Sequence, residues 1–261
     1  MNDACDYRMS TQLDPDLAAF SISALSELKR AIRAVVEAPS DATETLTQSL
    51  WTWGVSLATL AHDVASSVHI LATHDGVRAA MVLNRCLSEY RVRLDYYVEN
   101  PEIATADLSQ FDDELRRVFQ AKPFDHLDAF LSTSQMERIR AFVDEPNERL
   151  GRRNVRSMFD DVFGDRAGAV YGVHYAIASA FVHGGVLATA DVFRKSESAD
   201  PTDYTFHFTT NVFSLNSVLG EAVVHVIAML RTMNRLFGLH NDGERLAKDF
   251  TPILSRIEPA L

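Results

Sequence analysis

Two helical segments of the sequence carry side chains whose types and spacing could do chemistry. The first contains Arg85 and Glu89, which are four residues apart and therefore neighbours on one face of a helix. The second contains Tyr175, Ser179 and His183, again spaced by four, so that they follow one gently winding stripe. Apolar residues flank both sets. A helical bundle that buries such groups must pair them with each other or use them to bind something.

Each set has a structural and a functional interpretation. Arg85 and Glu89 form either an intrahelical ion pair, worth only about 0.3–0.5 kcal/mol when exposed, or part of a partly buried site. For His183 the choice is between a cation at a helix C-terminus and a group that titrates near neutrality as an acid, a base or a ligand. Both choices stay open on the sequence.

Glu221 and His225 repeat the four-residue spacing on the last long helix. Carboxylates and imidazoles on facing helices are the usual ingredients of a metal site in a bundle, which here would use Glu89 and His183 as well. Because these helices lack the E-x-x-H and H-x-x-x-H motifs, we predict no metal ligands and no cofactor. The predicted binding residues are Arg85, Glu89, Tyr175, Ser179, His183, Glu221 and His225.

The elements that must position these residues are helices. Apolar residues at helical spacing, with proline and glycine at the boundaries, predict an all-α bundle of about eight helices. The predicted helices span residues 15–36, 40–71, 77–99, 102–121, 124–143, 148–163, 168–183 and 214–239, with a short terminal helix after 243. Residues 186–209 are richer in β-formers and fit either a short hairpin or a mobile loop, of which we favour the loop.

The composition is that of an ordinary globular protein. Of the 261 residues 47% are hydrophobic and 23% charged, and we predict a disordered stretch at 1–12 followed by one helical domain at 13–261. The formal charge of −11 argues against non-specific attraction to nucleic acid or to an anionic membrane. With two cysteines and neither a signal peptide nor a long unbroken apolar run, we expect a cytoplasmic protein without a membrane partner. A homodimer through the apolar helices is compatible with this pattern.

The R-x-x-x-E helix ending at Asn100-Pro101 and the later Y-x-x-x-S-x-x-x-H-G helix resemble a widespread bacterial helical family known mainly as a domain of unknown function. The resemblance covers residues 57–239 in order and spacing. It implies a single all-α domain whose signature positions are the five polar residues of the two helices. No activity comes with it.

More distantly, the architecture resembles the HEPN helical ribonucleases of defence and toxin systems. Their hallmark is an arginine about four to six residues before a histidine on one helix, and Arg235-Leu-Phe-Gly-Leu-His240 has that spacing. In a metal-independent ribonuclease, His183 would be the general acid or base, Arg85 would stabilise phosphate charge and Tyr175 would assist.

Three hypotheses follow. We favour a cytoplasmic binding or interaction module whose buried polar site takes a small polar ligand or a protein partner, with a role in bacterial defence or stress response. The second is the ribonuclease, whose partner would be RNA. The third is a helical metalloprotein.

Overall fold

The computed structural model describes residues 12–38, 48–74, 76–109, 132–134, 136–137, 154–176, 179, 193–195, 204–206 and 214–257. Its α-helices are α1 Pro15–Val36, α2 Gln48–Thr73, α3 Val77–Glu99, α4 Pro101–Ser109, α7 Val155–Phe163, α8 Ala167–Tyr171, α11 Leu215–Phe237 and α12 Gly243–Ile257. A 3-10 turn, Gly164–Arg166, precedes α8, and a π turn, η4, follows it at Gly172–Ala176. The predicted all-α multi-helix bundle is confirmed.

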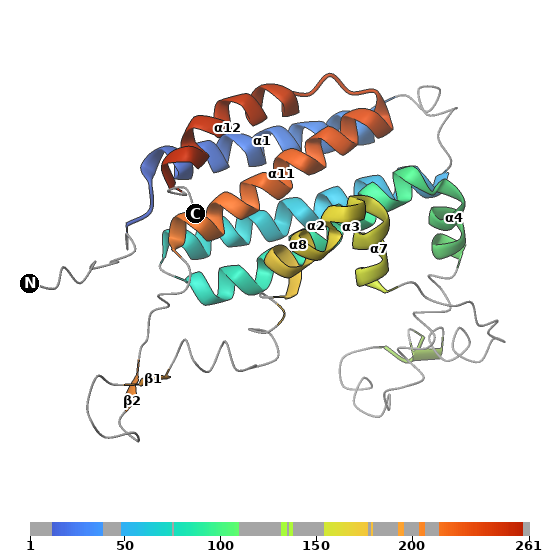
Figure 1. Cartoon of the computed structure of the whole chain (residues 1–261). Coiled ribbons are helices and arrows are strands. Elements are labelled where there is room, and N and C mark those ends of the chain that lie inside the picture. The colour runs from blue at the N-terminus through green and yellow to red at the C-terminus, as the bar shows by residue number, and fades with distance from the viewer. Residues whose placement is uncertain are drawn as a thin grey trace, which may run out of the picture.

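The central helix of the bundle is α11. It packs against α1, α2, α3 and α12, and Figure 1 shows it between the pair α1–α12 and the pair α2–α3. Its sequence is apolar around most of the helix, as burial by several neighbours requires. Ser214 caps its start by accepting from the Ser217 amide at 2.9 Å, and Gly238, with a φ of 62°, ends it in the left-handed conformation.

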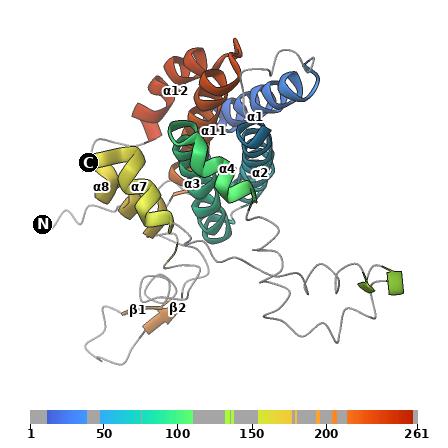
Figure 2. The same ribbon diagram turned by 90° about the vertical axis from the view of Figure 1, so that its right-hand side faces the viewer.

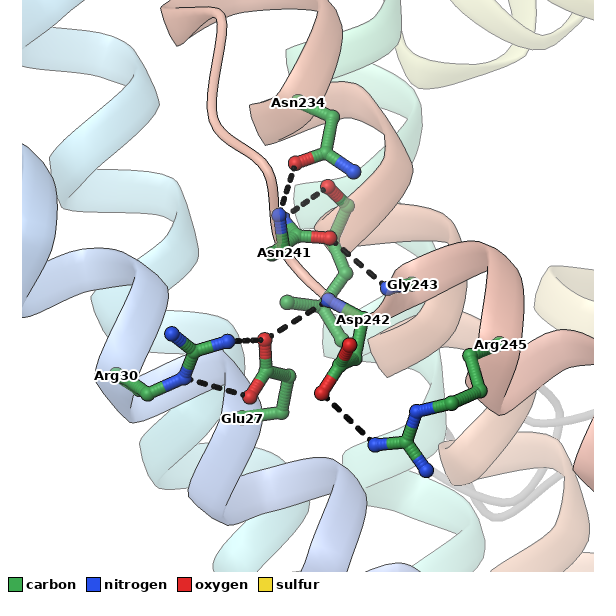
Figure 3. Close-up of polar contacts among 8 residues, drawn as sticks. Glu27, Arg30, Asn234, Asn241, Asp242, Gly243 and Arg245 are labelled. Carbon is green, nitrogen blue, oxygen red and sulfur yellow. Dashed lines mark hydrogen bonds and ion pairs between the residues drawn. The ribbon is translucent and has the colours of Figure 1, made fainter.

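Hydrogen bonds join α1 to the connection between α11 and α12 (Figure 3). We call the contacts among Glu27, Arg30 and Asp242 the clasp. Glu27 on α1, only 9% exposed, accepts from Arg30 at 2.9 and 2.6 Å and from the Asp242 amide at 2.9 Å. In the same connection the Asn241 side chain accepts from the Gly243 amide at 2.9 Å. Burial by itself would raise the pKa of Glu27, but the hydrogen bonds from Arg30 and Asp242 lower it. The clasp therefore needs Glu27 ionised.

The predicted helices agree best with the structure where a clear start or stop signal flanks them. The helix at Val77–Glu99 has the predicted bounds, and α1 begins at Pro15 with Asp14 accepting from the Leu17 amide at 3.0 Å. The predicted single helix over 148–163 is wrong. Asn154 has an extended backbone and accepts from the Ser157 amide at 2.8 Å, so α7 begins only at Val155.

The predicted continuous α-helix over 168–183 is also wrong. The α-helical part, α8, ends at Tyr171. The backbone of η4, Gly172–Ala176, then forms the wider i→i+5 hydrogen bonds of a π-helix. Ser179 is helical again, whereas the end of the predicted helix, with His183, lies outside the described residues.

The described residues of the 186–209 segment favour the hairpin over the loop that we predicted, and residues 196–203 lie outside the described part. The strands β1, Phe193–Lys195, and β2, Tyr204–Phe206, pair antiparallel with Phe193 opposite Phe206. Of the predicted helix at 124–143, the structure describes five residues, of which 133–134 and 136–137 are helical. Residues 1–11 lie outside the described part, and the single domain stays a prediction.

Within the described part of the chain, two helices are long and apolar enough to cross a membrane, judged by length and composition alone. They are α2 and α11, in whose most apolar windows 33% and 72% of the residues are buried inside the bundle. Core helices of a bundle meet the same criteria, and α11 is one by its burial.

Candidate functional site

Polar side chains from three elements meet where α3, η4 and α11 pack together. His174 comes from η4, Glu221 and His225 lie one turn apart on α11, and Asn84 comes from α3. We call these four residues the polar cluster. Figures 1 and 2 show α7 and α8 beside α3, and both η4, which continues from α8, and α11 pack against α3.

Glu221 is the centre of the polar cluster. Its Oε1 lies 2.8 Å from Nδ1 of His174 and 3.7 Å from Nε2 of His225, and its Oε2 accepts from Asn84 Nδ2 at 3.2 Å. Burial would raise the pKa of Glu221, but the neighbouring imidazoles lower it to about 2. Glu221 is therefore a fixed negative charge near neutral pH.

His225 is the member of the polar cluster with the fewest hydrogen bonds. It is 3% exposed, and neither ring nitrogen has a hydrogen-bond partner among the described residues. The 3.7 Å to Glu221 is too long for a hydrogen bond, and the ring of His174 meets it edge-on with centroids 5.3 Å apart. Burial lowers the pKa of His225, outweighing Glu221, and the charge of Arg91 lowers it further. The ring is thus neutral, with a lone pair available.

One potential ligand atom each from His174, Glu221 and His225 lies within 4.8 Å of the other two. In tetrahedral zinc sites, bonds of about 2.0–2.1 Å place neighbouring ligand atoms about 3.3 Å apart. The spacing of 2.8 Å around Glu221 is shorter than that value and the spacing of 3.7 Å is longer. The side chains would have to shift from these positions to bring the three atoms around one ion.

The two polar sets predicted from the sequence do meet, through Arg85 and Tyr175. The Arg85 guanidinium donates to the Tyr175 hydroxyl at 2.9 Å and lies 4.9 Å from the centre of its ring. Between them and the polar cluster, the Ser88 hydroxyl donates to the backbone carbonyl of His174 at 3.3 Å. This contact fixes η4 against α3.

Of the two interpretations of Arg85 and Glu89, the intrahelical ion pair between them does not form in the structure. Glu89 pairs instead with Arg93, at 3.2 Å. A carboxylate four residues before a cation is the favourable order on a helix, and Arg85 stands on the unfavourable side of Glu89. Of the other predicted residues, Ser179 is half-buried and His183 lies outside the described residues.

Sequence reasoning missed His174 and Asn84. Each directly precedes a residue that we did single out, Tyr175 and Arg85, and on an ideal α-helix such a neighbour points about 100° away. His174 lies in a π turn, where the 100° rotation per residue of an α-helix does not apply, so its direction cannot be inferred from that of Tyr175. Only the concentration of histidine and tyrosine at 174–175 could have drawn attention to it.

The arginine–histidine pair expected from ribonucleases does not lie on one helix. Arg235 belongs to α11, but the helix ends at Phe237, before His240. The Arg235 guanidinium contacts Asp95 at 3.2 Å and Glu99 at 3.3 Å. The spacing in the sequence therefore does not correspond to a shared catalytic face.

A model of a family of unknown function, DUF5677, matches residues 52–200, more than half of the chain. The chain belongs to that family. The prediction of a family of unknown function is thus confirmed, while the signature positions and the bacterial origin stay predictions. Comparison with curated proteins and with solved structures gave no match. The DUF5677 match includes Asn84 and His174 and ends before Glu221 and His225, so the polar cluster joins the matched region to a helix that follows it.

Proposed function

We propose that this DUF5677 protein is a helical binding module whose polar cluster holds one divalent transition-metal ion. The observation that carries the proposal is His225, a buried neutral imidazole with no hydrogen-bond partner among the described residues, facing an ionised carboxylate. A buried polar side chain in a purely structural role normally has a partner, because desolvation without one costs about 1–3 kcal/mol. A metal ion would supply the missing bond.

The ligand set determines which metals fit. Two imidazoles and one carboxylate suit Zn²⁺, and the same combination with open positions is also used for Fe²⁺. Such a site is completed by water or by a ligand in the remaining position. A metal ion would take the place of the proton between Nδ1 of His174 and Oε1 of Glu221.

Asn84 suits the supporting role that metal sites need. It donates to Oε2 of Glu221 at 3.2 Å and to the Val218 carbonyl at 2.8 Å, which fixes the carboxylate and leaves Oε1 toward the imidazoles. Outer hydrogen bonds of this kind orient metal ligands. The Oδ1 of Asn84 is buried without a partner in the described structure, so it is available to accept from a metal-bound water.

The test is metal binding by the full chain without a histidine tag. Elemental analysis after purification, followed by calorimetric titration of the chelator-treated protein with Zn²⁺, should give about one ion per chain. Glu221→Gln keeps the shape of the side chain but removes its charge. We expect it to weaken Zn²⁺ binding by at least about tenfold.

Two matched variants control for unspecific effects. Glu37→Gln makes the same change at the exposed end of α1, and His240→Asn removes an exposed histidine outside the polar cluster. Both should bind Zn²⁺ as the wild type does. A wild-type protein without bound metal and without a Zn²⁺ titration signal would overturn the proposal, as would Glu221→Gln binding with unchanged affinity.

The ribonuclease hypothesis keeps its own test. Its acid or base, His183, lies outside the described residues, so that role stays a prediction. Incubation with mixed RNA, with and without chelator, separates a metal-independent nuclease from a metal-dependent one. Roles in defence or stress response and a cytoplasmic location also stay predictions.

A further inference from the structure

A groove of about 920 Å³ runs between α3, α11 and α12, separate from the polar cluster. Apolar side chains on α11 and α12 form part of its lining, among them Val224, Ile227, Phe250 and Leu254. Its volume falls within the range of about 300–1,000 Å³ typical of small-molecule sites, which are mostly apolar with a few polar groups. We call it the α11–α12 groove.

The groove is more cationic than the protein that contains it. Its cationic side chains are Arg91, Arg231, Arg235 and Lys248, against the carboxylates Asp95 and Glu244. The difference is two positive charges, in a chain whose formal net charge is −11. A local excess of the opposite sign attracts anions despite the overall charge.

The carboxylates in the lining are already engaged. Asp95 is buried, accepts from the Thr232 hydroxyl and lies 3.4 Å from Arg91 and 3.2 Å from Arg235. Arg235 also reaches Glu99, at 3.3 Å, just outside the lining. Asp95 is shared by two arginines, so its negative charge is offset and it does not repel an anion. Glu244 forms an exposed pair with Arg231 at 2.7 Å, so an anion held by Lys248 must displace Glu244 to reach Arg231, which costs little because exposed pairs are weak.

We infer that the α11–α12 groove binds a small amphipathic anion, with its apolar part between α11 and α12 and its carboxylate or phosphate head near Arg231 and Lys248. The apolar lining excludes a bare inorganic anion as the best occupant, because it would leave that lining in water. The excess positive charge selects against neutral and cationic amphiphiles. This inference does not rest on the metal proposal.

The groove and the polar cluster nevertheless use residues of the same two helices, α3 and α11. Arg91 lines the groove, and its positive charge acts on His225, where it lowers the pKa. Val224, next to His225 in the sequence, also lines the groove. The groove therefore adjoins the polar cluster along α11.

The test is calorimetric titration with decanoate and decyl phosphate, with chelator present so that metal binding plays no part. Decyltrimethylammonium and decanol are the probes of opposite and zero charge. We expect both anions to bind at least about tenfold more tightly than the cation. The double variant Arg231→Gln/Lys248→Gln should weaken anion binding by about tenfold, since exposed charges each contribute modestly.

Two further variants make the result specific. Arg245→Gln removes an exposed charge from α12 outside the groove and should leave binding unchanged. Ala247→Trp, at a groove-lining position, should abolish binding while circular dichroism stays unchanged. Absence of anion binding would overturn the inference. So would equal binding of the cation, or binding that neither the double variant nor Ala247→Trp alters.

Discussion

Burying a histidine costs free energy unless its ring nitrogens find partners, and His225 illustrates the problem. Both of its nitrogens are buried, and its nearest carboxylate oxygen, on Glu221, is 3.7 Å away. By contrast, His174 forms a 2.8 Å hydrogen bond to the same oxygen. The polar cluster is thus half satisfied in its hydrogen bonding, which is the condition under which a buried polar group is most expensive.

Replacing His225 by leucine should therefore have opposite effects with and without metal. With chelator present, His225→Leu should be as stable as the wild type or up to about 2 kcal/mol more stable, because the change removes a desolvation penalty. With Zn²⁺ present, only the wild type should gain stability. Urea unfolding under both conditions measures this, and a large loss of stability in chelator would show that His225 has partners we have not identified.

The stability of the metal-free protein should fall with acidification through the range in which His225 titrates. Because burial lowers its pKa in the folded state, the unfolded chain binds the proton more readily below about pH 6.5. The contribution of His225 is therefore complete above that value and is lost as the pH falls through the folded pKa. Burial lowers the pKa of His69 as well, which adds to the effect.

The measurement is the free energy of unfolding between pH 7.5 and about pH 5.5. His225→Leu should have a shallower slope than the wild type, and His69→Asn isolates the other contribution. Equal slopes for wild type and His225→Leu would contradict the pKa assignment.

At the scale of elements, the sequence predicts where helices begin and end better than it predicts which of their faces meet. The bounds of α3 follow from Gly76 before it and Asn100-Pro101 after it, and Asp14-Pro15 fixes the start of α1. These are local signals, read within a few residues.

The polar cluster depends on information that is not local. The π turn at η4 directs His174 toward α11, and a backbone irregularity of this kind leaves no periodic trace in the sequence. Glu221 and His225 could be singled out from their spacing, but their partner could not, because it depends on how η4 packs on α3. The partner of Glu89 could not be decided from spacing either, because arginines lie one turn before it and one turn after it, and the structure pairs it with Arg93.

The crossing of α2 and α11 depends on Gly54. A Cβ atom there would lie 2.6 Å from the Phe237 ring and 2.7 Å from a methyl group of Leu236. Steric crowding of this kind costs about 1–3 kcal/mol, against which alanine gains up to about 1 kcal/mol of helix propensity. We expect Gly54→Ala to lower stability by about 1 kcal/mol.

The matched control is Gly168→Ala in α8, where a Cβ would meet nothing within 4 Å. This variant should be more stable than the wild type by about 0.5–1 kcal/mol. Thermal unfolding of both proteins measures the difference. If Gly54→Ala were the more stable of the two, α2 and α11 would be less closely packed than described.

The clasp between α1 and the α11–α12 connection should contribute measurably to stability. Glu27→Gln loses the charge that Arg30 contacts, although an amide oxygen can still accept from the Asp242 backbone. We expect a loss of about 1–2 kcal/mol at neutral pH. Because the pKa of Glu27 is lowered in the folded state, the difference from wild type should shrink as the pH falls below about 4.5.

Glu244→Gln is the comparison for the clasp, since it breaks an exposed pair with Arg231 at 2.7 Å. Exposed pairs are worth about 0–1 kcal/mol, so this variant should be close to wild type. Equal losses in the two variants would mean that the clasp has no special role.

At the scale of the whole molecule, α11 takes part in the polar cluster, the α11–α12 groove, the crossing with α2 and the clasp. It carries Glu221 and His225 of the polar cluster, lines the α11–α12 groove, crosses α2 at Gly54 and leads into the clasp. Because its burial comes from several neighbours at once, a ligand held by α11 and η4 should stabilise the bundle as a unit.

Zinc should therefore raise the midpoint of global unfolding. At a free concentration one hundred times Kd the expected gain is about 2.7 kcal/mol, or several degrees in Tm for a chain of this size. Scanning calorimetry of wild type and Glu221→Gln measures it. Only the wild type should shift, and a shift of the same size in Glu221→Gln would assign zinc to another site.

The most direct measurement is anomalous diffraction from zinc-soaked crystals, collected on both sides of the zinc absorption edge. We expect one strong peak bounded by His174 Nδ1, Glu221 Oε1 and His225 Nε2, with bond lengths of about 2.0–2.2 Å. In Glu221→Gln crystals soaked in the same way the peak should be lost or greatly reduced. Wild-type crystals with no peak among these three side chains, at zinc concentrations that saturate binding in solution, would contradict the account.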